Sequence, residues 1–435
     1  MTTLDARDVP TEPISAERLA AAGLEYRLVD FADESVAKSY QRAVSRGFLG
    51  GEPTAEALAY GKTPFETRRN TAVFDPASPT AEFPVATVNS WVAPLTVPGG
   101  SEIDMWSISV VTVAATHRRR GIARALLEGE LRAAASAGAP MAGLTVSEAT
   151  IYGRYGFGSA IPMSRFEVDT RRAGWAGPSP AGRIQYRERE ELADDLGVVH
   201  DRVRRTRPGQ VSGWRTRWEG FAGVSPSDSE RDKVRGVRYL DESGAVRGVL
   251  VYTLGEKGGT FRFGLHVRML VAETPDATAA LWRFALQHDL VDEVTAELRP
   301  LDDPLPWLVA DPRGVVQTVH DHGWLRILDV AAALSARRFS APLDVVLRIE
   351  DALGFASGDW RLRVAESGVA TVEPASAAAE VDATMDVAVL STLYAGGVRV
   401  STLHGAGLIA ADADVAERLD RAFASFPVPA LDIWY

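Results

Sequence analysis

The feature that most restricts the fold of this chain is a strand, a basic turn and a helix that follow one another without interruption. Residues 105–113 are mostly β-branched or apolar, as in a buried strand. Residues 120–137 repeat apolar side chains at helical spacing, and Gly138 and Pro140 mark the end of that helix. Another apolar strand is expected over residues 142–146, so the segment predicts an α/β fold around a mixed sheet.

The basic turn predicts an anion-binding site. Gly121 opens the helix, where free backbone N–H groups and the positive end of the helix dipole point at one place. Because Gly121 has no side chain, a phosphate group can approach the backbone closely. The surrounding cations are Arg118, Arg119, Arg120 and Arg124, in a chain of net charge −11. The alternative is a set of solvent-facing arginines at an ordinary helix start, since basic triplets are common.

Length, charge and cysteine content narrow the class of protein. A chain of 435 residues is long enough for two or three domains. Its net charge of −11 argues against nucleic acid as a partner, and the lack of cysteine excludes disulfides and thiolate metal sites. No run of about 18 apolar residues is present, and the acidic first residues do not resemble a secretion signal. A cytoplasmic protein that does not bind membranes is therefore expected.

The rest of the chain divides into further units. Residues 47–62 are rich in glycine and are expected to be mobile. Residues 171–183, rich in proline, glycine and arginine, look like a connection to a second pattern of strands and a helix over residues 184–288. An alanine-rich third unit begins near residue 323. The predicted domains are residues 1–170, 171–317 and 318–435.

The end of the chain is apolar and aromatic rather than polar. Residues 426–435 read Phe-Pro-Val-Pro-Ala-Leu-Asp-Ile-Trp-Tyr. Leaving such side chains in water forgoes about 1.5–3 kcal/mol for each large one. We therefore expect the end to be buried, with the carboxylate of Tyr435 in a pocket or an interface. The alternative is a terminus that is simply packed and has no chemical role.

The basic turn resembles a known signature. Val111-x-Val113 followed by Arg118-x-x-Gly121-x-Ala123 is similar to the acetyl-CoA pyrophosphate signature of the GNAT acetyltransferase superfamily. As a binding element, the strand before the turn would offer backbone groups to an extended ligand arm. The full run of strand, basic turn, glycine and helix favours this interpretation over solvent-facing arginines.

Longer stretches resemble one family within that superfamily. Residues 112–121 and 147–158 are similar to the enhanced-intracellular-survival (Eis) family of actinobacterial acetyltransferases, and the resemblance covers nearly the whole chain. It implies an α/β (α+β) fold with tandem GNAT domains on mixed β-sheets. It also implies a C-terminal α+β domain like that of sterol carrier proteins, seen in residues 386–396 and 424–426. The family further implies a homohexamer.

The resemblance assigns roles to individual residues. Tyr152 would be the general acid, and the carboxylate of the last residue, Tyr435, would be the general base. No metal is implied, and His320 with His322 lacks a third ligand nearby in the sequence. The expected contacts to acetyl-CoA are Val111, Thr112, Val113, Arg118, Arg119, Arg120, Gly121, Ile122, Ala123, Arg124, Ser147 and Glu148.

The chemistry supports these roles to different degrees. An amine that attacks a thioester must lose a proton, and the departing thiolate must gain one. A tyrosine hydroxyl and an alkyl thiol have similar ordinary pKa values, so Tyr152 can donate, although it can also be read as a core tyrosine. The Tyr435 carboxylate is a much weaker base than an amine, so direct proton removal from an ammonium ion is uphill. Burial would raise the pKa of the carboxylate and make it a stronger base. Alternatively, it would act through a water molecule, remove the proton from the more acidic tetrahedral adduct, or anchor a cationic substrate.

These observations favour an acetyl-CoA-dependent N-acetyltransferase. The acceptor would be a primary amine of a cationic molecule, such as an aminoglycoside, a polyamine or a lysine-like group. Transfer would be direct within a ternary complex, since there is no cysteine to carry an acyl group. Val110 stands where the family often has an aromatic residue, so no antibiotic specificity follows. The alternative is a lipid- or small-molecule-binding protein that uses the sterol-carrier-like domain.

Overall fold

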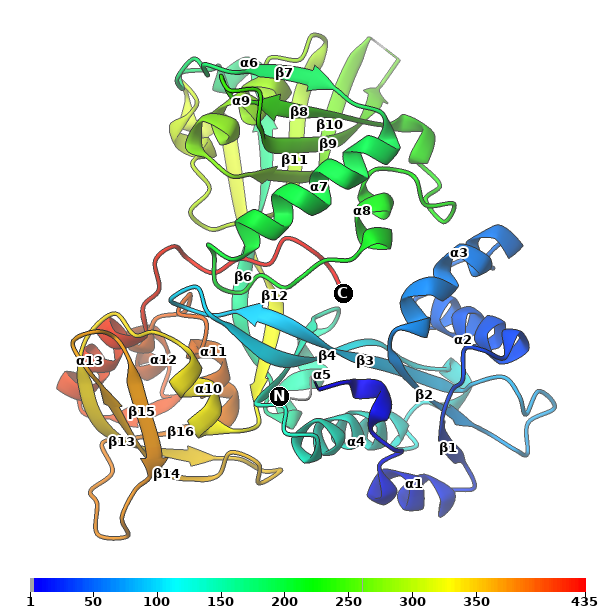
Figure 1. Ribbon diagram of the computed structural model, residues 1–435, viewed down its shortest axis with the longest axis vertical. Helices are drawn as coiled ribbons and strands as arrows, with labels where there is room; N and C mark the ends of the chain where they lie inside the picture. Colours follow the sequence, from blue (N-terminus) through cyan, green and yellow to red (C-terminus); the bar gives the residue numbers. More distant parts are fainter. Residues whose placement is uncertain (1–3, 260) are drawn as a thin grey trace. The chain divides into compact units, whose positions relative to one another are not determined.

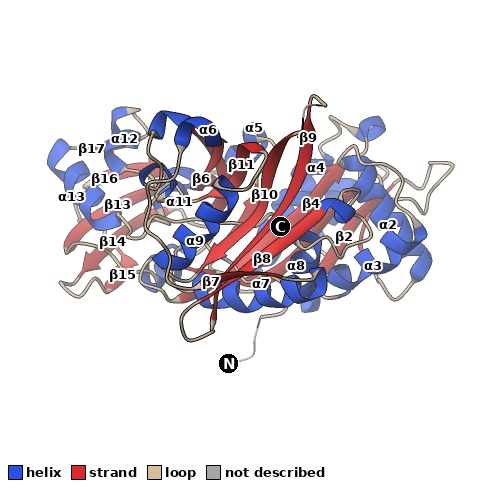
Figure 2. Ribbon diagram, turned by 90° about the horizontal axis from the view of Figure 1, so that it is seen from above, coloured by secondary structure: helices blue, strands red, loops and turns tan. Residues whose placement is uncertain are grey.

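The computed structural model describes residues 4–259 and 261–435. The chain forms two compact units (Figure 1), and each has a hydrophobic core of its own. The first unit comprises residues 1–160, residues 323–425 and Tyr435. The second comprises residues 161–322 and 426–434. Helices and strands both contribute substantially, which confirms the predicted α/β class (Figure 2).

The first unit is built on a mixed sheet. Its strands are β1 (Glu25–Leu28), β2 (Arg69–Phe74), β3 (Ala86–Thr96), β4 (Glu102–Val113) and β5 (Met141–Thr145), in that order. The pairs from β1 to β4 are antiparallel, whereas β4 and β5 are parallel and are joined by α4 (Ile122–Ser136). The last residues of β12 (Val315–Ile327) pair antiparallel with β5. The predicted strand, helix and strand are therefore present.

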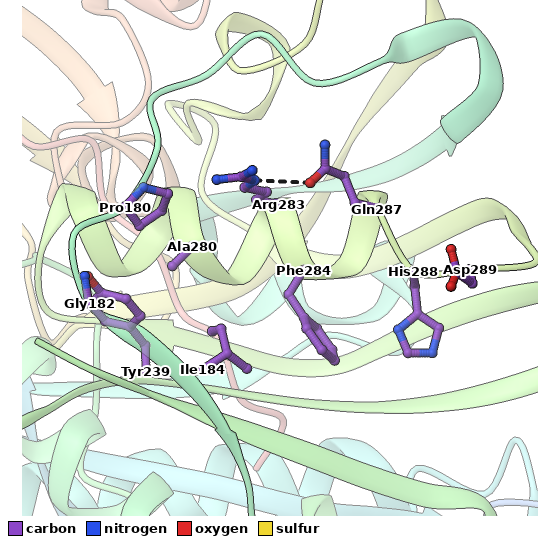
Figure 3. Close-up of a pocket in the computed structure, with 10 residues that line it drawn as sticks. All are labelled: Pro180, Gly182, Ile184, Tyr239, Ala280, Arg283, Phe284, Gln287, His288 and Asp289. Atoms are coloured by element: carbon purple, nitrogen blue, oxygen red, sulfur yellow. Dashed lines mark hydrogen bonds between the residues drawn. The ribbon is translucent and has the colours of Figure 1, made fainter.

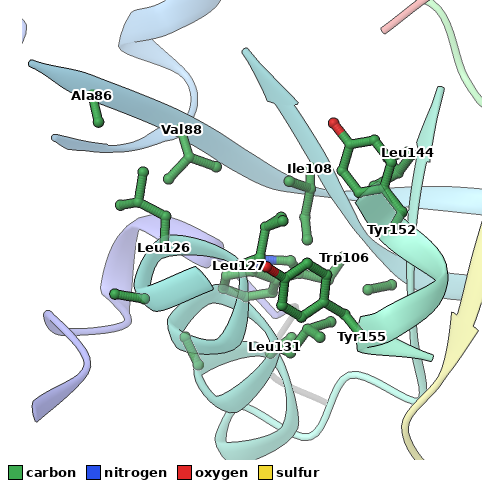
Figure 4. Packing of buried hydrophobic residues seen from close by; sticks show 14 of the residues in the cluster. Ala86, Val88, Trp106, Ile108, Leu126, Leu127, Leu131, Leu144, Tyr152 and Tyr155 are labelled. Atoms are coloured by element: carbon green, nitrogen blue, oxygen red, sulfur yellow. The ribbon is translucent and has the colours of Figure 1, made fainter. Parts of the chain in front are cut away.

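Helices cover both faces of this sheet (Figure 1). Helix α4 covers one face with its apolar stripe, and α1 (Pro13–Ala20) packs beside it. Figure 4 shows the resulting core, in which Trp106, Leu127 and Leu131 are fully buried. Helix α2 (Glu34–Gly47) packs on β3 and β4 and forms a smaller cluster of its own.

The expectation of a mobile segment over residues 47–62 is wrong for its second half. Helix α3 (Ala55–Glu66) begins there, and the Thr54 hydroxyl caps it by accepting a hydrogen bond from the Ala57 N–H at 3.1 Å. The glycines at 47, 50 and 51 precede the helix, whereas residues 55–60 have good helix formers. Phe65 of α3 stacks on Phe31 with ring centroids 5.2 Å apart.

The sterol-carrier-like part of the first unit has a separate sheet. Its order is β15 (Ala370–Pro374), β14 (Gly358–Val364), β13 (Leu343–Glu350), β16 (Ala383–Asp386) and β17 (Ile409–Ala411). The accompanying helices are α10 (Val330–Ala336), α11 (Val387–Leu393), α12 (Val400–Gly405) and α13 (Ala413–Phe423). The buried guanidinium of Arg337 donates to the carbonyl oxygens of Tyr394 and Phe423, at the ends of α11 and α13. This contact joins two helix ends, where a cation is favourable.

The second unit repeats the strand, helix and strand pattern. Its sheet runs β6 (Gly158–Asp169), β11 (Val291–Arg299), β10 (Arg262–Ala272), β9 (Val246–Lys257), β8 (Val234–Leu240) and β7 (Arg183–Tyr186). β10 and β11 are parallel and are joined by α9 (Pro275–Leu286), as β4 and β5 are joined by α4. The other helices are α6 (Thr170–Ala173), α7 (Arg189–Arg204) and α8 (Arg215–Phe221). No helix in the described part of the chain is long and apolar enough to span a membrane.

Candidate active site

The site begins where β4 and β5 stop pairing. Their register runs from Met105 opposite Met141 to Ser107 opposite Gly143, and β4 then continues to Val113 without β5 as a partner. Val110 has a φ of +47°, and the pairing of β3 with β4 shifts register at this level. A bulge of this kind bends a strand. The backbone of β4 beyond Ser107, including Val111–Val113, is therefore left free on the side of β5.

The basic turn leads from β4 into an uncapped helix. Arg119 and Gly121 both have left-handed backbone conformations, with φ of +61° and +78°, so α4 starts at Ile122 rather than at residue 120. No side chain caps this helix end, and a Cβ built on Gly121 would meet no atom within 4 Å. The N–H groups of the first turn therefore face open space, as an anion site requires.

The four arginines of the turn are exposed, and two of them form ion pairs. Arg124 pairs with Glu128 at 2.6 Å, and Arg120 lies 4.0 Å from Asp75. Arg118 and Arg119 form no ion pair within residues 4–259 and 261–435. His117 bonds to Asp75 at 3.0 Å, and this contact lowers the pKa of the Asp75 carboxyl. The turn is thus anchored to Asp75, directly after β2, while Arg118 and Arg119 stay available to a ligand.

Tyr152 lies just beyond the end of β5. The chain passes through the exposed residues Ser147 and Glu148 into α5 (Ala149–Tyr152), and the Tyr152 ring is buried. In Figure 4 its hydroxyl points out of the core cluster, whereas Tyr155 lies against Leu131 and Trp106. Burial raises the pKa of the Tyr152 hydroxyl, and a hydrogen bond with Ser147 opposes part of the shift. The hydroxyl is therefore protonated at neutral pH and able to donate.

The last residue is seated on the end of β5. The Thr145 hydroxyl donates to a carboxylate oxygen of Tyr435 at 2.7 Å and accepts from the Tyr435 N–H at 3.3 Å. The Tyr435 ring packs edge-on against Trp91, with centroids 5.6 Å apart, and only 8% of the residue is exposed. The prediction of a buried end is confirmed for Leu431, Ile433 and Tyr435, but it is wrong for Phe426 and Trp434, which are 85% and 43% exposed. Its carboxylate lies at the same strand end that leads to Ser147 and Tyr152.

Three parts of the chain match known domain families. Residues 29–160 and residues 209–327 each match an acetyltransferase (GNAT) domain, and residues 330–431 match a sterol carrier protein domain. An uncharacterised N-acetyltransferase of Streptomyces avermitilis is 34% identical over 386 residues, 86% of this chain and 90% of its own length. The N-acetyltransferase Eis of Mycobacterium tuberculosis is 34% identical over 341 residues, 76% of this chain and 81% of its own. The chain belongs to the Eis family of GNAT N-acetyltransferases.

A solved structure agrees with this membership. Eis1 from Mycobacterium abscessus superposes with a TM-score of 0.79 and 28% identity, over 95% of this chain and 100% of that chain. The tandem GNAT domains and the sterol-carrier-like domain implied by the sequence are therefore confirmed. This Eis-family chain is an acyltransferase, and GNAT domains in general use acetyl-CoA.

In this Eis-family chain, the helix start in the second GNAT domain differs from that in the first. At the start of α9, the Thr274 hydroxyl accepts a hydrogen bond from the Ala277 N–H at 3.1 Å, so one N–H group is already used. Pro275 supplies no N–H, and Asp276 adds a negative charge. These residues disfavour a phosphate at α9, in contrast to the open start of α4.

Other features of the Eis-family chain lie outside the predicted site. Figure 3 shows a pocket of about 580 Å³ in the second unit, which contains none of the predicted site residues. Among the described residues, no group of three or more His, Asp or Glu side chains is placed to hold a metal ion. His322 bonds instead to the carbonyl oxygen of Ile433 at 3.0 Å.

Two contributors to the site are absent from the sequence interpretation. Thr145 has no sequence signal, because a threonine at a strand end is common and its bond to Tyr435 joins residues far apart in the sequence. The bulge at Val110 has no sequence signal, since valine rarely adopts a positive φ. Among the described residues, no hydrogen bond joins Tyr152 to Tyr435.

Proposed function

We propose that this chain is an acetyl-CoA-dependent N-acetyltransferase that acetylates a primary amine of a cationic acceptor by direct transfer in a ternary complex. The observation that carries the proposal is the open, uncapped start of α4 at Gly121, beside the strand ends that separate after Ser107 and Gly143. The helix start would bind a diphosphate, and the free edge of β4 would bind an extended acyl arm.

The proposal gives each predicted residue a physical task. The backbone of Val111, Thr112 and Val113 would bind the extended arm, because β5 does not pair with it. The N–H groups of the α4 start would bind the diphosphate, and the exposed arginines would add charge. Ser147 and Glu148 would line the opposite side, at the end of β5. The residues at the start of α4 are Arg118, Arg119, Arg120, Gly121, Ile122, Ala123 and Arg124.

Transfer would proceed in one covalent exchange. The lone pair of the acceptor amine attacks the thioester carbon, a C–N bond forms and the C–S bond breaks. Tyr152 donates its hydroxyl proton to the departing sulfur, which leaves as the thiol. The nitrogen gives up a proton to the Tyr435 carboxylate, directly or through water. The tyrosinate and the carboxylic acid then return to their starting states by exchange with solvent.

An acetyl-CoA consumption assay tests this function. The panel contains polyamines, aminoglycosides and lysine peptides, because the net charge of −11 is compatible with cationic acceptors. We expect thiol release that depends on at least one of these amines. If the protein binds acetyl-CoA but releases no thiol with any amine, the transferase function is contradicted.

The same proposal includes three domains, a homohexamer and a cytoplasmic location. The domains would span residues 1–170, 171–317 and 318–435. Light scattering on the purified protein measures the mass of the assembly against a chain of 46.8 kDa.

Lipid binding by the sterol-carrier-like domain has no comparable support. Among the described residues, the fully buried guanidinium of Arg337 lies over the rings of Phe339 and Phe423, which contact each other, so this part of the domain is filled by its own side chains.

A further inference from the structure

We propose that Thr145 is a positioning residue that orients the terminal carboxylate of Tyr435, and that the Tyr435 side chain is a fixed anchor rather than a reacting group. The inference rests on the proposed function, in which this carboxylate accepts the proton of the acceptor amine. The observation behind it is that one hydroxyl binds two groups of the same terminal residue.

The two hydrogen bonds fix the direction of the carboxylate. The Thr145 oxygen accepts from the Tyr435 N–H at 3.3 Å, so its own proton is free to point at the carboxylate oxygen 2.7 Å away. Binding both sides of the Tyr435 Cα restricts rotation about the bond to the carboxylate. One oxygen is held by Thr145, which leaves the other to accept a proton from an amine or a bridging water. A hydrogen bond to a charged group is also stronger than a neutral one.

The Tyr435 ring is closely packed against neighbouring side chains. Its hydroxyl lies 4.0 Å from the Met105 sulfur, and its ring meets Trp91 edge-on. A Cβ added to Gly143 would lie 2.3 Å from the Met105 sulfur and 3.1 Å from the Tyr435 hydroxyl. A side chain at Gly143 would therefore displace Met105 or the ring.

The phenol of Tyr435 is unsuited to proton transfer. Burial raises the pKa of this hydroxyl well above its ordinary value, so it stays neutral. Its hydrogen-bond partner among the described residues is a thioether sulfur, a weak acceptor. The side chain therefore supplies packing, while the main chain supplies the reactive group.

Two substitutions at one position test Thr145. Thr145→Val keeps the shape but removes the hydroxyl, and Thr145→Ser keeps the hydroxyl. We expect Thr145→Val to lower kcat by about tenfold to a hundredfold, the scale of a lost hydrogen bond to a charged group, with the KM for acetyl-CoA unchanged. We expect Thr145→Ser to restore most of the lost rate. The acidic limb of the pH–rate profile of Thr145→Val should move to higher pH, because the hydroxyl stabilises the ionised carboxylate.

Equal rates in the two variants, or an unshifted acidic limb in Thr145→Val, would overturn the positioning role. Thermal unfolding and acetyl-CoA titration of both variants show that the fold and the cosubstrate site are intact. A protein whose terminal Tyr435 carboxylate is converted into a primary amide, with the ring kept in place, separates this failure from that of the proposed function. If that protein keeps full activity, the carboxylate is not the base. If it is inactive while Thr145→Val is fully active, only the positioning inference fails.

Discussion

Tyr152 combines a buried ring with a hydroxyl at the edge of the core. Burial favours its neutral form, and this raises the pKa from its ordinary value of 10.0. The group therefore retains its proton across the physiological range, which suits a donor to a departing thiolate. Its ring also packs edge-on against Phe157, 6.1 Å away between centroids, so its position is set by the core.

Replacing Tyr152 by phenylalanine removes the hydroxyl and keeps the packed ring. We expect kcat to fall by more than about tenfold, the lower range for a lost general acid, while acetyl-CoA affinity is retained. In the unmodified protein, any loss of kcat caused by ionisation of Tyr152 should appear at a higher pH than for an exposed tyrosine, because burial raises the pKa of its hydroxyl. Steady-state kinetics across pH check both points. Unchanged turnover in Tyr152→Phe would remove this residue from the mechanism.

Helix α4 is fixed to the sheet by a buried carboxylate. Glu130 is 1% exposed and accepts hydrogen bonds from the Ser90 hydroxyl at 2.6 Å and the Trp106 indole at 3.2 Å. It also pairs with the buried guanidinium of Arg69 at 3.4 Å. These contacts tie the helix to β2, β3 and β4, and they hold its open start in place over the strand ends.

Removing this carboxylate should destabilise the first unit strongly. In Glu130→Ala, the charge of Arg69 stays buried without its partner, so we expect a loss of about 3–5 kcal/mol in the free energy of unfolding. Glu130→Gln is the matched control, because its amide keeps part of the hydrogen bonding and should cost less. Urea unfolding of the two variants measures the difference. Equal and small losses would show that the pair does not hold α4 in place.

The elements of the first unit and of its candidate site were predictable to different degrees. The helix start at Gly121 and the strand on each side of α4 were predicted, because periodic apolar residues and a glycine with basic neighbours are local signals. Helix α3 was missed, since the glycines before it dominated the composition of that segment. The separation of β4 from β5 and the contact of Thr145 with Tyr435 depend on residues distant in sequence, so local patterns do not reveal them.

The last residues of the chain take part in both units. Residues 426–434 belong to the second unit, and Tyr435 belongs to the first. Within the second unit, His200 bonds to the Asp432 carboxylate at 3.1 Å and His322 bonds to the Ile433 carbonyl at 3.0 Å. Because that carbonyl accepts from the Nε2–H of His322, the buried Nδ1 carries no proton and has no partner among the described residues.

This arrangement predicts acid sensitivity of the second unit. Burial lowers the pKa of His322 to about 4 from an ordinary 6.5, so the folded state resists protonation that the unfolded state accepts. Stability is therefore present above pH 6.5 and is lost as the pH falls towards 4, by about 2 kcal/mol between pH 7 and pH 5. Denaturant unfolding at these two pH values measures the loss. His322→Gln, which keeps a donor but does not titrate, should show a smaller pH dependence; an equal dependence would contradict this assignment.

Extending the chain tests the terminal carboxylate at the scale of the whole molecule. One glycine added after Tyr435 converts the Tyr435 carboxylate into a peptide amide, moves the terminal carboxylate one residue away from Thr145, and leaves every other residue unchanged. We expect turnover to fall by at least about a hundredfold, within the usual range for losing a general base, while acetyl-CoA still binds. A matched extension at the N-terminus controls for added length. Full activity in the C-terminally extended protein would exclude the carboxylate as the base.

The central claim is that the open start of α4 binds the diphosphate of coenzyme A, and calorimetry with acetyl-CoA tests it most directly. Gly121→Ala and Gly138→Ala form a matched pair, since both glycines flank α4, have φ near +80° and have no atom within 4 Å of an added Cβ. Each alanine carries the same backbone strain, of about 1–2 kcal/mol. We predict that only Gly121→Ala weakens acetyl-CoA binding, by about tenfold or more, because its methyl group occupies the path of the phosphate. Equal affinity in the two variants, or no binding by the unmodified protein, would contradict the account.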